Sequence, residues 1–342
     1  MINELIKLEK KYFKYFYKSG YDFRELFIAK ILNDYYKNKE ILKKRIENNI
    51  NFKFYYNSKI SRDFLLNPSN KIDYIWEPQT TKLLLNISKD KKNVFFGGAF
   101  FGDQAVLCAK LNPKTNFHAF EPSSNQLKCL RLNKKINNVS NLKIINKVLY
   151  SKSNLKFNLE SSNLPGKKSD EGEIRIIIDK LKNNKSKKSI SIDDYCKINK
   201  INFIDLIQID VEGAENEIIK GSSQMLKNNR IENIIFEMNS NYVSWKKGLQ
   251  GTKIVKLLKK YKFKIYAIRD LHSSFNLRDV KIELLPLKNV FLKGPKHGFN
   301  MIATKSKKLD RYIINETYSP KYLFYKKENN FHTKGLNDAY KN

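Results

Sequence analysis

The chain has 342 residues, of which 41% are apolar and 13% aromatic, so it can build a substantial core and is not a disordered protein. No stretch approaches the ~20 continuous apolar residues that a membrane helix needs, and the first residues lack the segments of a signal peptide. Three cysteines without CxxC spacing indicate reduced thiols rather than disulfides. We therefore expect a cytoplasmic protein without a membrane span.

The charge balance is strongly basic, with 66 Lys and Arg residues against 34 Asp and Glu residues and a net charge of +32. Such an excess can indicate nucleic acid, an acidic membrane surface or an anionic substrate as the partner. Most of these residues are Lys, spread along the chain among abundant Asn, Ile, Tyr and Phe, which share AT-rich codons. Arg, which reads phosphates and bases in a bidentate manner, is scarce. Genome composition accounts for the excess, and the charge alone does not support nucleic-acid binding.

The first 70 residues show apolar side chains at helical spacing, and the pattern extends through residues 41–50. We predict that residues 1–70 form an N-terminal helical region. It carries no recognisable chemistry and is suited to contacts with a second copy of the chain.

From about residue 72, predicted strands alternate with predicted helices. Strands are expected at residues 93–96, 116–120, 142–145, 203–209, 232–238, 263–268 and 299–304, and helices at residues 81–88, 103–111, 123–137, 214–227 and 250–261. This alternation predicts one α/β domain over residues 71–305, with a mainly parallel sheet covered by helices on both faces. We predict a long polar loop around residues 164–173 and an irregular, basic and aromatic tail over residues 306–342.

The first predicted strand leads through glycines at positions 97, 98 and 102 directly into a predicted helix. Glycine lets the backbone turn tightly and approach a ligand, and the helix offers unpaired N–H groups. Glu121 ends the next strand, 23 residues beyond Gly98, where an acid in a Rossmann-type fold accepts the ribose hydroxyls. The unit therefore predicts a site for an adenosyl cofactor.

The glycine spacing indicates which cofactor this is. A dinucleotide site uses G-x-G-x-x-G so that the backbone can meet a pyrophosphate. Here Gly98 and Gly102 are separated by three residues, and the bulky Phe100 and Phe101 occupy the turn. The pattern favours a cofactor without phosphate, such as S-adenosylmethionine, whose amino-acid end we expect the loop amides to hold. NAD is the less favoured alternative.

A second constellation follows the predicted strand at residues 203–209, which delivers Asp210 and Glu212 to its carboxyl end before a helix begins. In open α/β sheets, ligands bind beyond the carboxyl ends of the strands, so Asp210 is predicted to be functional. Glu215 also fits a simpler role, because an acid is favourable in the first turn of a helix.

The run Ile209-Asp210-Val211-Glu212-Gly213-Ala214-Glu215 resembles the signature of the FkbM-type S-adenosylmethionine-dependent methyltransferases. Four further motifs occur in that family in the same order: Trp76-Glu77-Pro78, Gly98-Ala99 with Gly102, Phe120-Glu121-Pro122 and Ser191-Ile192-Asp193-Asp194-Tyr195. The resemblance covers about residues 75–240, or half of the chain. It implies a class I methyltransferase Rossmann-like fold, with a seven-stranded sheet whose last strand is antiparallel, and O-methylation of a hydroxyl on a sugar, glycan or related small metabolite.

We predict that the cofactor is bound by Gly97, Gly98, Ala99, Phe101, Gly102, Asp103, Glu121, Pro122 and Asp210. Asp210 is the candidate base or acceptor-orienting residue, Glu212 and Glu237 are alternatives, and His297 is a reserve candidate for the base. No metal site is predicted, because these carboxylates are dispersed along the sequence.

One position departs from the family pattern. The family commonly has Asp two residues before the first loop glycine, where it helps to orient the methionine ammonium, and this chain has Phe96 there. Asp103 could compensate, or the site could be degenerate. The alternatives are therefore a non-catalytic binding module and a methyltransferase acting on RNA or protein. The missing Asn/Asp-Pro-Pro-Tyr/Phe motif counts against the usual amino-group chemistry on nucleobases.

Overall fold

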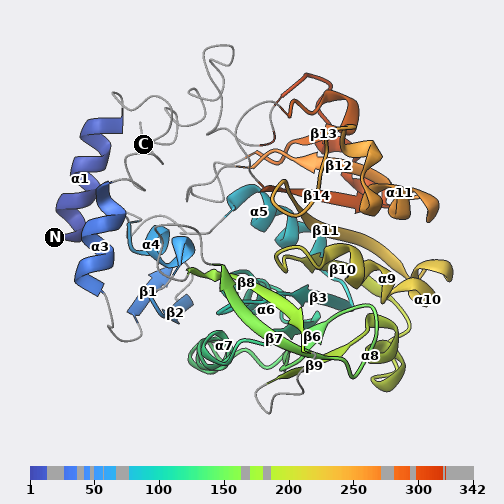
Figure 1. The fold of residues 1–342 in the computed structure, drawn as a ribbon, viewed down its shortest axis with the longest axis horizontal. Coiled ribbons are helices and arrows are strands. Elements are labelled where there is room, and N and C mark those ends of the chain that lie inside the picture. The colour runs from blue at the N-terminus through green and yellow to red at the C-terminus, as the bar shows by residue number, and fades with distance from the viewer. Residues whose placement is uncertain are drawn as a thin grey trace.

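The computed structural model describes residues 1–13, 27–36, 42–46, 50–56, 58–66, 77–162, 170–179, 186–270, 281–292, 298–318 and 320. Its largest sheet has the strand order β13-β12-β14-β11-β10-β3-β4-β5 (Figure 1). The strands are β3 Asn93–Gly97, β4 Asn116–Phe120, β5 Leu142–Ile145, β10 Ile204–Ile209, β11 Ile231–Asn239, β12 Lys264–Ile268, β13 Leu284–Pro286 and β14 Gly298–Thr304. Neighbouring strands from β5 to β11 pair in parallel, whereas β14 is antiparallel to both β11 and β12.

The predicted class I methyltransferase fold is confirmed, with one strand more than the seven expected. The additional strand is β13, which pairs antiparallel with β12 at the sheet edge. It has three residues, too few for a period-2 pattern to be visible in the sequence.

Helices cover both faces of this sheet, and each face has its own core. One face carries α5 Pro78–Ser88, α6 Asp103–Leu111 and α7 Ser124–Ile136; the other carries α8 Ile192–Ile198, α9 Glu215–Lys220, α10 Ser223–Lys227 and α11 Lys253–Lys260. The alternation of side chains along β3 divides Phe95 and Phe96 between the two cores. Because both faces are covered, all six residues of β10 are buried.

The helix predicted over residues 214–227 is two helices. The break lies at Gly221 and Ser222, where the Ser222 hydroxyl donates to the carbonyl of Ile219. The Asp193 carboxylate then accepts from the backbone N–H groups of Gln224 and Met225, which gives α10 its own N-terminal charge partner. A capping residue so far away in the sequence gives no local signal.

A second, four-stranded sheet has the order β6-β9-β7-β8 and is formed by β6 Val148–Leu149, β7 Lys156–Ser162, β8 Asp170–Ile178 and β9 Lys187–Ile190 (Figure 1). The predicted polar loop around residues 164–173 is therefore partly wrong, since residues 170–173 belong to β8. β7 and β8 pair antiparallel, with Phe157 opposite Ile178 and Leu159 opposite Ile176. Residues 163–169 lie outside the described residues.

The N-terminal region contains α1 Ile2–Phe13, α3 Ala29–Tyr36 and α4 Lys59–Leu66, as predicted in type. The prediction that helical structure continues through residues 41–50 is wrong, because β1 Leu42–Ile46 and β2 Ile50–Phe54 form an antiparallel hairpin instead. Phe52 and Phe54 of β2 are buried against Phe101, so this hairpin belongs to the core of the large sheet. The N-terminal region also has a small hydrophobic cluster of its own, formed by Leu5, Ile6, Ile28, Leu32 and Leu66.

In the part of the chain that the structure describes, no helix combines the length and the apolar character needed to cross a bilayer. Cys108, Cys129 and Cys196 are all buried and free.

Candidate functional site

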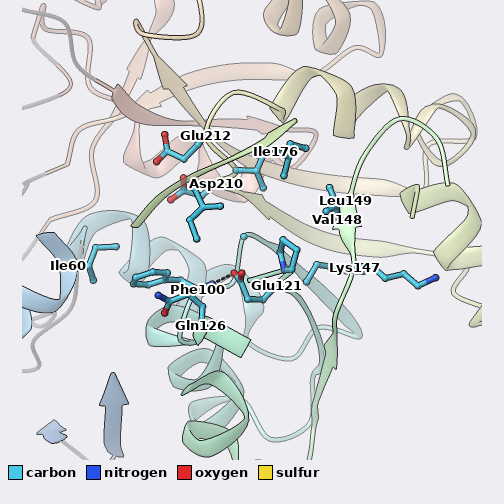
Figure 2. Close-up of a pocket in the computed structure, with 15 residues that line it drawn as sticks. Ile60, Phe100, Glu121, Gln126, Lys147, Val148, Leu149, Ile176, Asp210 and Glu212 are labelled. Carbon is cyan, nitrogen blue, oxygen red and sulfur yellow. Dashed lines mark hydrogen bonds between the residues drawn. The ribbon is translucent and has the colours of Figure 1, made fainter. Parts of the chain in front are cut away.

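A pocket lies beyond the carboxyl ends of β3, β4 and β10 and encloses about 730 Å³ of space, part of it open to solvent. Asp210 and Glu212 lie on one side of it, and Phe100, Glu121 and Gln126 on the other (Figure 2). The wall is completed by Ile60, Gly98, Phe120, Pro122, Lys147, Val148, Leu149, Ile174, Ile176 and Val211.

Glu121 follows β4 and is only 6% exposed. Its Oε2 accepts from the backbone N–H of Phe100 and its Oε1 from that of Ser123, each at 2.8 Å. Burial raises the pKa of Glu121 to about 7, against the lowering effect of these hydrogen bonds and of Lys187. Because each carboxylate oxygen has a second lone pair, Glu121 can still accept hydrogen bonds from two ligand hydroxyls.

The glycine loop brings β3 into contact with the end of β10. Gly98 has φ +78°, and a Cβ atom there would lie 1.8 Å from the carbonyl oxygen of Asp210, so only glycine fits. The N–H groups of Gly98 and Ala99 both donate to the carbonyl of Phe120, at 3.1 Å. These amides are thus paired within the protein, contrary to the expectation that they serve as free donors for a ligand.

Asp103 begins α6, directly after the loop. Burial raises the pKa of its carboxyl to about 7; hydrogen bonds from its own N–H and that of Gln104 lower it, and the charge of Asp210 raises it further. The negative charge of Asp210 thus opposes ionisation of Asp103.

Three carboxylates gather where β10 and β11 end. Carboxylate oxygens of Asp210, Glu212 and Glu237 lie within 4.8 Å of one another. The residues are dispersed along the sequence, but the fold brings their carboxylates together, so the reason given for predicting no metal site is wrong. Such a set could hold a metal ion or a cationic group of a cofactor. Glu215 stands apart, because its Oε1 accepts from the backbone N–H groups of Val211 and Gly213 and so supports the turn.

The structure separates the predicted cofactor residues into three groups. The pocket wall contains Gly98, Glu121, Pro122 and Asp210, together with the alternative base Glu212. The loop next to it, outside the wall, contains Gly97, Ala99, Gly102 and Asp103. The third group is Phe101 alone: its side chain is fully buried in the core, and the neighbouring Phe100 occupies the wall instead. His297 lies outside the described residues.

Several wall residues were missed in the sequence. Val148 and Leu149 follow a predicted strand, and an apolar pair at the carboxyl end of a strand was a usable signal. Ile60 comes from α4, and Ile174 and Ile176 come from β8. These three reach the pocket through tertiary packing, for which the sequence holds no local signal.

Phe96 is 1% exposed and lies outside the pocket wall. Its ring packs 6.2 Å from that of Phe117, within the core beneath α5 and α6. The position that commonly carries an acid is therefore part of the apolar core in this chain.

Comparison with known proteins gives one family match. Residues 97–265 match the model of the methyltransferase FkbM domain, whereas no curated protein matches the sequence. Similar solved structures include a SAM-dependent methyltransferase from Agrobacterium tumefaciens (6% identity, TM-score 0.41, 78% of this chain and 71% of that one). Another is M. jannaschii TYW2 in complex with AdoMet (13% identity, TM-score 0.38, 78% of this chain and 86% of that one). The match runs from the glycine loop into β12, so residues 97–265 of this chain form an FkbM domain of the S-adenosylmethionine-dependent methyltransferases.

Proposed function

We propose that this protein transfers the methyl group of S-adenosylmethionine to a hydroxyl of a sugar, glycan or related small metabolite. The observation that carries the proposal is the charge of the pocket. Although the chain has a net charge of +32, three carboxylates line the pocket wall, those of Glu121, Asp210 and Glu212. The Lys147 ammonium points away from them (Figure 2). An acidic wall suits the sulfonium and ammonium of S-adenosylmethionine and repels the pyrophosphate of NAD.

Residues of the wall, together with Asp103 in the loop beside it, suit the three parts of this cofactor. Glu121 would accept the ribose hydroxyls, and the apolar Val148 and Leu149 would contact the adenine ring. Asp210 and Asp103 would pair with the methionine ammonium, in place of the acid that Phe96 replaces. This assignment follows from the mutual effect of the two carboxyls and from the core position of Phe96.

Methyl transfer is an in-line displacement. The acceptor oxygen bonds to the methyl carbon, the carbon–sulfur bond breaks with its electron pair passing to sulfur, and the hydroxyl proton passes to a base. Asp210 would orient the acceptor or take this proton, and Glu212 is the alternative. Ile60, Ile174 and Ile176 would exclude water from the reacting groups.

Methyl transfer from [methyl-¹³C]-S-adenosylmethionine to a panel of neutral and acidic glycans tests the proposal. We expect Asp210→Asn to lower the rate by at least about 100-fold, as loss of a general base does, and Asp310→Asn, an exposed acid of the short helix η5 Lys307–Tyr312, to leave it unchanged. An unchanged rate in Asp210→Asn would remove Asp210 from the mechanism. If calorimetry detects no binding of millimolar S-adenosylmethionine, the protein is a non-catalytic module.

A second candidate function is methylation of RNA. It is favoured by a surface hollow that Arg131, Lys134 and Lys135 line at the end of α7. Phosphate contacts weaken steeply with salt, so an RNA-binding titration between 50 and 200 mM salt, roughly the range over which such contacts are lost, distinguishes the two functions. Binding that is tight and strongly salt-dependent would favour RNA over a small hydroxyl acceptor.

A further inference from the structure

Tyr242 lies in the loop after β11 and packs against the turn that carries Glu212. Its backbone N–H donates to the carbonyl of Asn239 at 3.0 Å. Gly213 has φ +105°, and a Cβ atom there would lie 3.0 Å from Cγ of the Tyr242 ring. The ring therefore fits directly onto the glycine that follows Glu212, and it fixes the shape of this turn.

The Tyr242 hydroxyl joins two charged side chains. Arg175 Nε donates to the Tyr242 oxygen at 3.3 Å, with the guanidinium carbon 4.7 Å from the ring centroid. The hydroxyl is also hydrogen-bonded to the Glu212 carboxylate. Arg has donors only and an ionised carboxylate has acceptors only, so the order is fixed. Arg175 donates to Tyr242, and Tyr242 donates its one proton to Glu212.

Arg175 belongs to β8, the strand that also supplies part of the pocket wall. Neighbouring residues of a strand point to opposite faces. The strand therefore presents Ile174 and Ile176 to the pocket and Arg175 to Tyr242. The position of the β7–β8 hairpin over the pocket and the orientation of the Glu212 carboxylate are linked through one tyrosine hydroxyl.

We propose that Tyr242 is a positioning residue for methyl transfer, which holds the Glu212 carboxylate toward the acceptor only while Arg175 keeps the β7–β8 hairpin over the pocket. The proposal rests on the proposed function. In this proposal the β7–β8 hairpin, which belongs to the second sheet, takes a direct part in assembling the acceptor site. Tyr242 does not line the pocket itself, so its effect on the site passes through the Glu212 carboxylate, which does.

Tyr242→Phe tests this, because it removes the hydroxyl and keeps the ring against Gly213. Tyr312→Phe is the matched control: Arg311 also lies 4.7 Å from the Tyr312 ring and donates to its hydroxyl, on η5 and away from the pocket. With the labelled cofactor and the glycan panel, we expect Tyr242→Phe to lower kcat about tenfold and to leave the KM for S-adenosylmethionine within about twofold. Tyr312→Phe should change neither.

One further readout separates positioning from general stability. Hydrogen exchange at residues 174–178 should also become several-fold faster in Tyr242→Phe and in Arg175→Met.

The outcomes are distinguishable. If the wild-type protein neither binds nor consumes S-adenosylmethionine, the proposed function fails. If the wild type is active and Tyr242→Phe matches it in kcat and in exchange, the inference is wrong. A loss of activity in Tyr242→Leu alone, with Tyr242→Phe unaffected, would show that the ring only packs against the turn and would equally overturn it.

Discussion

Phe96 illustrates how one side chain can be read differently from sequence and from structure. In the sequence it stands where the family commonly has an acid, which suggests a weakened cofactor site. In the structure the side chain is 1% exposed and points into the apolar core, so it neither blocks nor lines the pocket. In the proposed function, the pairing with the methionine ammonium therefore falls to Asp103 at the start of α6 and Asp210 just after β10.

Restoring the acid should therefore damage the fold instead of improving binding. Phe96→Asp removes a large buried ring and places a carboxyl without partners in the core, so we expect a loss of at least about 3–5 kcal/mol in the free energy of unfolding. Phe96→Leu, which keeps the site apolar, should lose only about 1–1.5 kcal/mol. Urea unfolding measures both. A stable Phe96→Asp protein with tighter S-adenosylmethionine binding would show that this side chain reaches the pocket.

His118 is a buried base in the middle of β4. Its Nδ1 lies 2.9 Å from the Tyr195 hydroxyl oxygen, and its ring is 4.7 Å from that of Phe95. Burial, with a smaller effect of Lys143, lowers the pKa of His118 from 6.5 to about 4. The unfolded chain thus takes up a proton as the pH falls through 6.5, while the folded protein does so only near pH 4. Stability from this group is complete above pH 6.5 and is lost between pH 6.5 and 4.

We expect the free energy of unfolding to fall by up to about 3 kcal/mol over this interval because of His118. Buried acids of raised pKa act in the opposite direction over the same pH range, so the wild-type profile alone does not isolate the effect. The difference between wild type and His118→Phe in urea unfolding, measured from pH 4.5 to 7.5, does. If the two profiles run parallel, the histidine does not titrate in the way its burial implies.

The β2 strand is attached to the large core in an unusual manner. Its edge lies against the C-terminal end of α7. There the side-chain amides of Asn133 and Asn137, four residues apart, pair with the backbone of β2 as a neighbouring strand would. Asn133 Oδ1 accepts from Lys53 N–H at 2.7 Å and its Nδ2 donates to the Lys53 carbonyl at 2.9 Å. Asn137 forms the same pair with Asn51, at 2.8 and 2.7 Å. Both asparagines are buried, so these bonds satisfy backbone groups that water cannot reach.

Loss of either amide should therefore detach the hairpin. We expect Asn133→Ala and Asn137→Ala each to cost about 1–3 kcal/mol, because buried backbone groups are left without partners. Lys128→Ala, at an exposed position of the same helix, is the control and should cost less than about 0.5 kcal/mol. Unfolding gives the energies, and hydrogen exchange at residues 50–54 should accelerate. Protection of β2 that survives both substitutions would contradict this role.

The elements that could be predicted from the sequence differ from those that could not in where their stabilising partners lie. The strands of the large sheet are short apolar runs, buried on both faces, and are visible from composition alone. The hairpin of β1 and β2 was misassigned as helix although Ile50, Phe52 and Phe54 alternate strictly, a period-2 signal that was available. β8 starts with charged residues and lies at the edge of its sheet, where it pairs with β7, so its sequence resembles a polar loop.

The site could be predicted to the extent that it lies on the motif-bearing ends of β3, β4 and β10. Gly98, Glu121 and Asp210 occupy the pocket wall, since the order of parallel strands brings these ends together. The part of the pocket wall formed by Ile60 and Ile176 could not be predicted, because these residues come from segments more than one hundred residues apart that meet only after folding. The choice between Phe100 and Phe101 depended on the local turn, in which Phe100 adopts φ 49°.

The charge distribution over the protein places acids of raised pKa around a pocket proposed for a cationic ligand. Burial raises the pKa of Asp103 and of Glu121 to about 7, well above their values in an unfolded chain. Their contribution to stability is therefore full below about pH 4 and is lost as the pH rises to 7, where the buried carboxyls ionise. A bound cation would offset that cost, because it stabilises the ionised acids.

It follows that binding of S-adenosylmethionine should strengthen as the pH rises from 5.5 to 8 and should release protons near pH 6.5. Calorimetry in buffers of different ionisation enthalpy measures both quantities. Asp103→Asn cannot ionise at this position, so we expect about tenfold weaker binding at pH 8 and a flatter pH dependence. 5′-Methylthioadenosine, which lacks the sulfonium and the ammonium, should keep only the part of the dependence due to Glu121. An affinity for S-adenosylmethionine that is constant over this range would mean that Asp103 does not face the cofactor's positive charge and that Glu121 does not bind the ribose hydroxyls as a carboxylate.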